Sequence, residues 1–298
     1  MGHEMSGTVT EVGFSVTQLK LGDKVAINPS LDDRSYNEEV CEVCASGRPN
    51  ICKRWACFGL NADGGGFAEE IVVRPFNCIR LPEGVSLKSG ALAEPLSVAS
   101  HMIRLSGFSK GQHVVVLGAG PIGLALLLLL KAWGAAKIVV SEVTESRSTQ
   151  AKQLGADIVV DPTKQGSGEG DPVVAAIKSL SPLGADIAFD ATGLQATLDT
   201  AIAATRPGGV VFNVAIHEKP LSLNLNDIAL TEKKLMGGIC YTNEDYEAVL
   251  DLIASGAIDA ETLITSVVPL ENVVEGGFLE LINNKASHVK ILIQPGAA

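Results

Sequence analysis

The amino-acid sequence predicts an α/β protein in which a doubly wound parallel sheet lies beside a second, β-rich domain. Three observations support this prediction: a length of 298 residues, short alternating strands up to about residue 104, and continuous apolar strands alternating with helices from about residue 107. At about 150 residues per domain, the length suits two domains with a core each. Continuous apolar strands joined by helices are typical of a parallel sheet covered on both faces.

The first domain is expected to consist of short strands and turns. The expected strands lie in the segments SGTVTEVG, GDKVAINP, GGGFAEEIVV and NCIRLPEG, which end at turn residues. The tail from residue 265 has the pattern strand, helix, strand, and we expect it to return to this domain. The first domain therefore comprises residues 1–104 and 265–298 in this prediction.

Residues 105–264 are expected to form the parallel-sheet domain. Helices are predicted over TESRSTQAKQL and over TNEDYEAVLDLIASG, which opens with polar capping residues and stops at Gly256. The expected strands are HVVVLG, AKIVVSE, ADIVVD, ADIAFDA, GGVVFNVAI and LMGGIC.

The composition excludes several classes of protein. Hydrophobic residues make up 46% of the chain and charged residues 19%, which argues against disorder. The formal net charge is −11, so we expect no nucleic-acid partner. The start, MGHEMSG, has no secretory signal, and the longest apolar run, 114–130, is interrupted by glycines and a proline. We therefore expect a cytoplasmic protein without a membrane segment.

The strand HVVVL leads into a glycine-rich turn that predicts a dinucleotide site. Glycines of this spacing allow a tight turn and close backbone approach to a pyrophosphate, which the N-terminus of the next helix can bind. The alternative is a structural glycine turn. The residues of the motif are Gly118, Gly120, Pro121, Ile122 and Gly123.

An acidic residue at the end of the next strand predicts the type of dinucleotide. Glu142 lies nineteen positions beyond Gly123, where a carboxylate accepts hydrogen bonds from the ribose hydroxyls. Because this carboxylate would repel a 2′-phosphate, we expect NAD rather than NADP. Arg147 is a further cofactor-binding candidate, and it leaves NADP open.

Three cysteines close together in the sequence suggest a metal rather than disulfides. Cys41, Cys44 and Cys52 offer three thiolates, one short of a closed tetrahedral zinc site. Glu38 could supply an oxygen as the fourth ligand, or could be a solvated acid beside Glu39.

Several segments together resemble the zinc-dependent medium-chain dehydrogenase/reductase family. They are GHEMSGTVTEVG, GDKVAINP, the cysteine cluster, GGFAEE, GALAEPLSVA, VLGAGPIGL and HVKILIQP, and they cover essentially the whole chain. SGRPNIC, NVAIHEKP, GGICYT and NNKASHVKIL are similar to its butanediol and sorbitol (polyol) dehydrogenase branch. The resemblance implies a Rossmann domain beside a GroES-like catalytic domain, and a homodimer or homotetramer.

The resemblance also implies roles for residues that the spacing alone leaves ambiguous. By itself, His3-Glu4 is an ordinary pair near the chain start, and Glu94 could simply cap a helix. In the family, His3, Glu4 and Glu94 would hold or adjoin a catalytic zinc, and the cysteines would hold a structural zinc. The nicotinamide would be lined by Val214, Ala215, Ile216, Ile239 and Cys240.

The implied reaction is hydride transfer between NAD and a secondary alcohol whose oxygen is activated by zinc. Polyol-specific relatives tend to carry arginine at the place of Cys240, so its absence favours a small vicinal diol or acyloin. Two alternatives remain: a non-catalytic NAD(H) binder and a zinc-independent reductase.

Relatives also carry a zinc-binding cysteine ahead of GHE, and no residue precedes Met1 here, so the GroES-like domain is expected to be N-terminally incomplete. On that ground we expect low catalytic-zinc occupancy and slow turnover of butane-2,3-diol.

Overall fold

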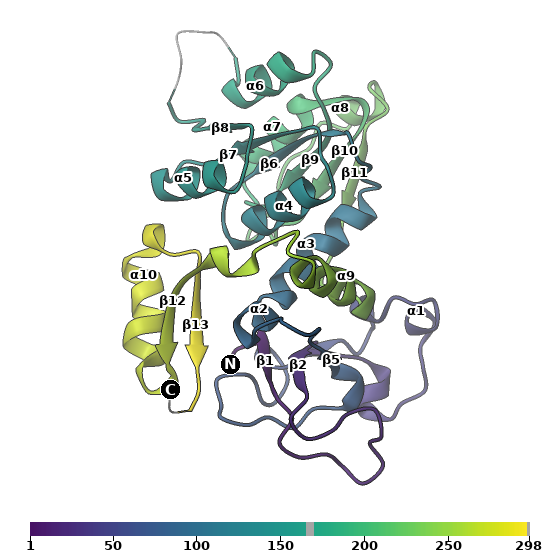
Figure 1. Cartoon of the computed structure of the whole chain (residues 1–298). Coiled ribbons are helices and arrows are strands. Elements are labelled where there is room, and N and C mark those ends of the chain that lie inside the picture. Colours follow the sequence, from purple (N-terminus) through teal and green to yellow (C-terminus); the bar gives the residue numbers. More distant parts are fainter. Residues whose placement is uncertain (165–169, 297–298) are drawn as a thin grey trace. The chain divides into compact units, whose positions relative to one another are not determined.

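The computed structural model describes residues 1–164 and 170–296, and these form two compact units (Figure 1). Unit 1 comprises Met1–Val98 and Cys240–Ala298, and unit 2 comprises Ala99–Ile239. These boundaries differ from the predicted ones, because the segment 240–264 groups with unit 1. Hydrogen bonds tie the helix of this segment to unit 1: Tyr246 Oη donates to the carbonyl of Ile27 across 3.1 Å, and Asn28 Nδ2 donates to Asn243 Oδ1 across 2.7 Å.

Unit 2 contains the predicted parallel sheet. Its six strands follow the order β11-β10-β9-β6-β7-β8, and every described neighbouring pair is parallel. The fold class predicted from the sequence is confirmed. The strands are β6 His113–Leu117, β7 Lys137–Ser141, β8 Ile158–Val160, β9 Ala185–Asp190, β10 Thr205–Asn213 and β11 Lys234–Gly237. The helices are α4 Pro121–Ala132, α5 Glu145–Gln153, α6 Pro172–Leu180, α7 Gln195–Ala204 and α8 Asn226–Ala229.

Apolar side chains on both faces of this sheet explain its parallel, covered form. On β6, Val115 and Leu117 belong to a core cluster that includes Ile177 of α6 and Ile202 of α7. Successive side chains of a strand point to opposite faces, so Val116 faces the other way. There it lies 3.7 Å from the Cβ position of Gly123 in α4. Helices therefore pack on both faces.

Unit 1 is built around a three-stranded antiparallel sheet of order β1-β2-β5. Its strands and those of the two smaller sheets are β1 Met5–Thr8, β2 Lys24–Ile27, β3 Ser30–Leu31, β4 Ala56–Cys57, β5 Cys78–Arg80, β12 Ile264–Pro269 and β13 Lys290–Gln294. Its helices are α1 Glu42–Ala45, α2 Leu87–Ala91, α9 Asn243–Ala254 and α10 Glu280–Asn283; α3, Ala93–Leu105, contains the boundary with unit 2.

One predicted strand of unit 1 is wrong. The segment GGGFAEEIVV, residues 64–73, belongs to no strand of the structure. Its first part is held instead by the chain start, because the N–H groups of Gly66 and Phe67 donate to the carbonyls of Gly2 and Met1. Its apolar residues Ile71 and Val73 still pack on the core of the sheet, which explains the alternating pattern.

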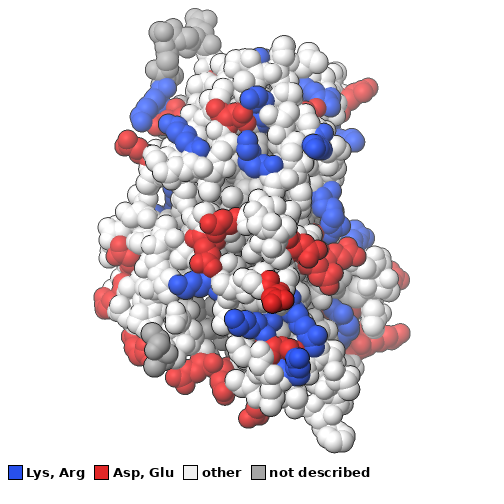
Figure 2. All heavy atoms as spheres, in the orientation of Figure 1, with Lys and Arg blue, Asp and Glu red and all other residues white. Residues whose placement is uncertain are grey.

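The C-terminal segment forms strand, helix and strand as predicted, and β12 pairs with β13 in parallel. Lys and Arg side chains lie interspersed with Asp and Glu over the face shown in Figure 2. Across the described ranges, no helix has the length and apolar character needed to cross a membrane.

Candidate catalytic, metal and cofactor sites

Three residues predicted to form a catalytic metal centre come together in unit 1. Ligand atoms of His3, Glu4 and Glu94 all lie within 4.8 Å of one another. His3 and Glu4 precede β1, whereas Glu94 lies in the first turn of α3. The fold thus brings together groups that are 90 positions apart, and one imidazole with two carboxylates is a ligand set that suits zinc.

Two residues outside the predicted set hold the two carboxylates. Lys290 Nζ, at the start of β13, lies 2.6 Å from each carboxylate oxygen of Glu4. Tyr241 Oη donates to Glu94 Oε1 across 2.6 Å. Each carboxylate therefore has a defined orientation. Sequence analysis missed both partners, although Lys290 lies in the quoted segment HVKILIQP and Tyr241 follows Cys240 in GGICYT.

The electrostatics of this cluster suit a bound cation. Burial, and then the neighbouring charge of Glu4, raise the pKa of Glu94 to about 8. Burial lowers the pKa of His3. Positive charge stabilises a buried carboxyl beside a second carboxylate, and Lys290 already supplies one such charge at Glu4.

The cysteine cluster also forms, but with a different fourth member. Asp33, Cys41, Cys44 and Cys52 place ligand atoms within 4.8 Å of one another. The predicted fourth member, Glu38, is not in this group, and its side chain is 52% exposed and 3.4 Å from Arg54 Nη2. Asp33, rather than Glu38, is therefore the acidic residue that lies among the three thiols, and of the two interpretations of Glu38 the structure favours the solvated acid.

The physical reason for this difference is the path of the chain before the cysteines. The 3-10 helix Asp33–Tyr36 ends at Asn37 with a left-handed φ of 54°, and the segment after it carries Glu38 outward. Asp33 is fully buried and accepts the N–H of Cys41 across 2.9 Å and Arg54 Nη1 across 2.8 Å. The N–H of Cys41 and the guanidinium of Arg54 hold the pKa of Asp33 well below its usual range.

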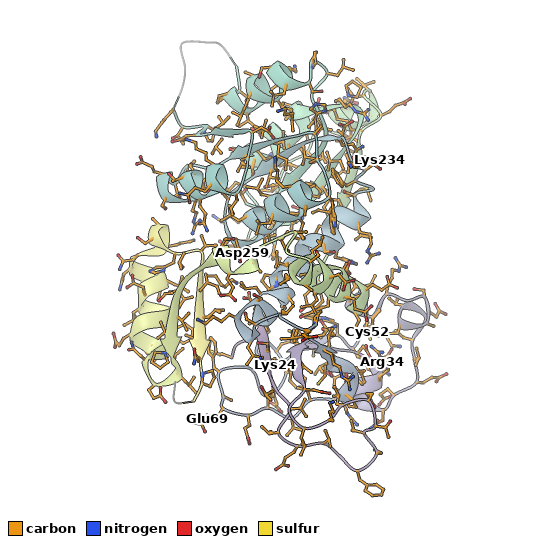
Figure 3. All side chains as sticks on the ribbon, in the orientation of Figure 1. Lys24, Arg34, Cys52, Glu69, Lys234 and Asp259 are labelled. Carbon is orange, nitrogen blue, oxygen red and sulfur yellow. The ribbon has the colours of Figure 1, made fainter. Side chains whose placement is uncertain are left out.

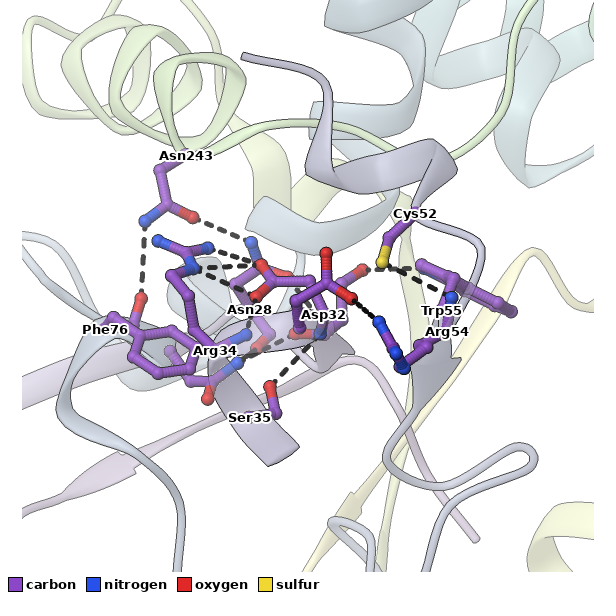
Figure 4. A network of polar contacts seen from close by, with 12 residues as sticks. Asn28, Asp32, Arg34, Ser35, Cys52, Arg54, Trp55, Phe76 and Asn243 are labelled. Atoms are coloured by element: carbon purple, nitrogen blue, oxygen red, sulfur yellow. Dashed lines mark hydrogen bonds and ion pairs between the residues drawn. The ribbon is translucent and has the colours of Figure 1, made fainter. Parts of the chain in front are cut away.

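A polar network lies next to this cluster (Figure 4). Arg34 forms an ion pair with Asp32, and its guanidinium carbon lies 4.5 Å from the centre of the Phe76 ring. Asn243 Nδ2 donates to the carbonyl of Phe76 across 3.3 Å. Arg34 thus links the loop that presents Asp33 to Phe76.

The glycine-rich turn of unit 2 has the geometry that a dinucleotide needs. A Cβ on Gly123 would lie 1.9 Å from the carbonyl oxygen of Gly118, so only glycine permits this close approach. A Cβ on Gly120 would meet nothing within 4 Å, which leaves open space at the N-terminus of α4. The N–H groups at that terminus have no partner within the helix and can bind a phosphate.

Glu142 follows β7 and is part of the same arrangement. Its Oε2 accepts the N–H of Ala119 in the turn across 2.8 Å, and its Oε1 accepts the N–H of Thr144 across 2.7 Å. The carboxylate is buried, and it retains lone pairs for further donors. Arg147 lies half-buried on α5.

The residues expected to line the nicotinamide lie at and beyond the ends of two strands. Val214, Ala215 and Ile216 follow β10, and Ile216 is 88% exposed. Ile239 follows β11 and is 45% exposed. Cys240 has a left-handed φ of 55°, an uncommon conformation for a side-chain-bearing residue that is found at functional sites.

Comparison with known proteins identifies the family. The model of the zinc-binding dehydrogenases matches residues 121–255, and that of the alcohol dehydrogenase GroES-like domain matches residues 1–83. The chain belongs to the zinc-binding alcohol dehydrogenase family. The predicted family, the alcohol or polyol dehydrogenase activity, and NAD and zinc as cofactors are thereby confirmed.

Similar proteins of this zinc-binding alcohol dehydrogenase family include two butanediol dehydrogenases. The chain is 40% identical over 308 residues to (R,R)-butanediol dehydrogenase of Saccharomyces cerevisiae, covering 99% of this chain and 80% of that protein. It is 36% identical to a probable D-xylulose reductase A of Emericella nidulans, with 100% and 81% covered. The crystal structure of 2R,3R-butanediol dehydrogenase from Bacillus subtilis matches with a TM-score of 0.89 and 37% identity, over 99% of this chain and 80% of that one.

Proposed function

We propose that this dehydrogenase interconverts a small vicinal diol, most readily (R,R)-butane-2,3-diol, and its acyloin with NAD as the hydride carrier. The observation that carries the proposal is the convergence of His3, Glu4 and Glu94 in one chain with a dinucleotide turn. The names of the relatives in Saccharomyces cerevisiae and Bacillus subtilis support the diol as substrate.

The first metal site would be held by His3 and Glu94, with Glu4 beside them. The chemistry supplied by zinc at this site would be Lewis-acid activation of the substrate hydroxyl. Lys290 keeps the Glu4 carboxylate directed and partly neutralised, and Tyr241 holds Glu94 through its Oε1. The chain itself would therefore contribute two carboxylates of fixed orientation, Glu4 and the buried Glu94. The alcohol would be oriented next to them.

The second metal site would be structural, held by Cys41, Cys44, Cys52 and Asp33. Three thiols and one carboxylate oxygen within 4.8 Å of one another suit tetrahedral zinc. The N–H of Arg54 lies 3.3 Å from Cys52 Sγ, and its guanidinium holds Asp33. Such contacts to ligand atoms orient a metal site.

The preference for a short diol rests on Cys240. Burial raises the pKa of its thiol to about 12, so the group is neutral at physiological pH. A neutral thiol offers only weak hydrogen bonding to the further hydroxyls of a long polyol. Similarity to xylulose reductases keeps a longer polyol as the second candidate.

The proposed assembly is a homodimer that pairs the sheet edges of two copies. β11 is the edge strand of the six-stranded sheet, and Leu235 on it is 43% exposed. Lys234 marks this strand in Figure 3. An unpaired edge can extend a sheet across a two-fold axis. Light scattering coupled to size-exclusion chromatography measures the mass of the assembly, which should be twice that of one chain.

The activity is tested with the zinc-loaded chain and NAD. The stereoisomers of butane-2,3-diol are compared with xylitol and sorbitol by the ratio kcat/KM, which we expect to be highest for the (R,R) diol. Glu94→Ala should lower this ratio about 10- to 100-fold or more. Glu83→Ala, at an exposed turn in the same unit, is the matched control and should retain activity. A higher ratio for sorbitol or xylitol would contradict the diol assignment.

A further inference from the structure

The His217 side chain connects the two loops that follow β9 and β10. Its Nδ1 lies 3.2 Å from the carbonyl oxygen of Gly193, and its Nε2 lies 2.7 Å from Asn213 Oδ1. The loops are in close contact, because a Cβ on Gly193 would lie 3.3 Å from both Ala215 Cβ and the carbonyl oxygen of Ile216.

The orientation of the Asn213 amide is determined by its other partner. Asn213 Nδ2 donates to the carbonyl of Ala215 across 2.9 Å, and a carbonyl oxygen can only accept. Rotating the amide by 180° would therefore place two acceptors against each other. Asn213 must present its oxygen, not its nitrogen, to the His217 ring.

Both nitrogens of the ring consequently face acceptors. A neutral imidazole carries one N–H and one lone pair, so it can donate to Gly193 or to Asn213 but not to both. The imidazolium form donates at both positions. The complete connection between the loops therefore requires the protonated ring.

No charged side chain takes the place of Gly193 or Asn213 as a hydrogen-bond partner of the His217 ring in the described part of the chain. Asp190, at the end of β9, uses its Oδ1 to accept the N–H groups of Thr192 and Gly193, which shapes the facing loop. Glu218 and Lys219 are next to His217 in sequence. For the described part of the chain, the structure gives His217 no ion pair, so its two hydrogen bonds are its polar contacts.

The segment between Asn213 and His217 contains Val214, Ala215 and Ile216, the residues assigned to the nicotinamide. We propose that His217 is a positioning residue: its ring, when it donates at both nitrogens, holds this segment in the conformation that receives the nicotinamide, so that NAD(H) binds more tightly when the ring is protonated than when it is neutral. The inference rests on the proposed function. A segment ordered before binding loses less conformational entropy when the cofactor arrives.

The test measures the Kd of NADH and of ADP-ribose, which lacks the nicotinamide, for the full chain between about pH 5.5 and 8.5. The Kd of NADH for the wild type should rise about three- to tenfold over this range, as expected for the loss of one hydrogen bond of ordinary net strength at an exposed side chain. His217→Ala should bind NADH weakly at every pH. His217→Arg, a permanent cation with several donors, should bind tightly without the pH dependence. None of these variants should change the Kd of ADP-ribose.

One control variant and two outcomes separate the possible failures. Glu218→Gln changes a charge on the same loop and should leave the wild-type pH dependence intact. If the wild type binds neither NADH nor ADP-ribose, the proposed function fails. If it binds NADH but His217→Ala has the same Kd and pH dependence, or if ADP-ribose binding is lost equally, the positioning role is overturned.

Discussion

The hydroxyl of Tyr241 donates a hydrogen bond to Glu94 Oε1 across 2.6 Å, although the two residues are 147 positions apart. Both side chains are buried, so neither group can exchange its partner for bulk water. The ring of Tyr241 also packs edge-on against Tyr246, with 5.1 Å between the centroids. A residue of the segment before α9 thereby orients the carboxylate that α3 contributes to the metal cluster.

Removing this hydroxyl should impair both catalysis and stability, whereas removing the neighbouring Tyr246 hydroxyl should impair stability alone. Tyr241→Phe leaves the buried Glu94 oxygen without its donor, a loss of about 1–3 kcal/mol, and we expect kcat/KM for the diol to fall about tenfold or more. Tyr246→Phe is the matched control, because its hydroxyl donates to the backbone of Ile27 instead. Tyr246→Phe should lower the melting temperature by about as much as Tyr241→Phe does, and it should leave kcat/KM nearly unchanged. Equal losses of activity in the two variants would contradict the positioning of Glu94 by Tyr241.

The fourth member of the cysteine cluster can be identified by metal content. Asp33→Ala should lose one equivalent of zinc per chain after dialysis, measured by inductively coupled plasma mass spectrometry. Glu38→Ala should retain it, because the Glu38 side chain points away toward solvent and Arg54. Loss of zinc in Glu38→Ala, with retention in Asp33→Ala, would restore the assignment made from spacing.

The preference for NAD over NADP should depend on Glu142. A 2′-phosphate would be placed against this buried carboxylate, so we expect the wild type to bind NAD at least about tenfold more tightly. Glu142→Ala also releases the N–H of Ala119, so both affinities should fall, but their ratio should approach one. Glu145→Ala, an exposed acid in the first turn of α5, serves as the control. Equal wild-type affinities for the two dinucleotides would refute the role of Glu142.

Asp186 should make the stability of unit 2 depend on pH. Burial alone would raise the pKa of this carboxyl, but the N–H of His113 and the guanidinium of Arg206 lower it below its usual value. A lowered pKa stabilises the folded state above the ordinary range of aspartate, and this contribution disappears as the pH falls through the folded-state pKa. Asp186→Asn should therefore lower the free energy of unfolding by about 1–2 kcal/mol at pH 7.

The difference between wild type and Asp186→Asn should shrink below about pH 4, measured by urea denaturation at several pH values. Asp199→Asn, at an exposed site on α7, should change stability by less than about 0.5 kcal/mol throughout. A difference that stays constant down to pH 2 would show that the charge of Asp186 is not responsible.

Local features of this protein were predictable from the sequence alone. The turn containing Gly118 and Gly123 is short and lies between an apolar strand and an apolar helix, and its close approach of Gly123 to the carbonyl of Gly118 is local in the chain. The same holds for the parallel strands, whose continuous apolar runs require cover on both faces. These patterns predicted the sheet, the dinucleotide turn and the family, because each depends on residues that are close together in the chain.

Only the tertiary structure decided which distant groups meet. Spacing left Glu38 open as either a member of the cysteine cluster or a solvated acid, and the chain after the left-handed turn at Asn37 carries it outward and leaves Asp33 among the thiols. The segment 64–73 alternates like a strand but bonds to the chain start instead. Tyr241 and Lys290 reach the carboxylates of Glu94 and Glu4 through the folded path of the chain. The sequence pattern specifies neighbours within a turn or a strand, whereas the side chains that meet beyond one element depend on how the chain turns and how the elements pack.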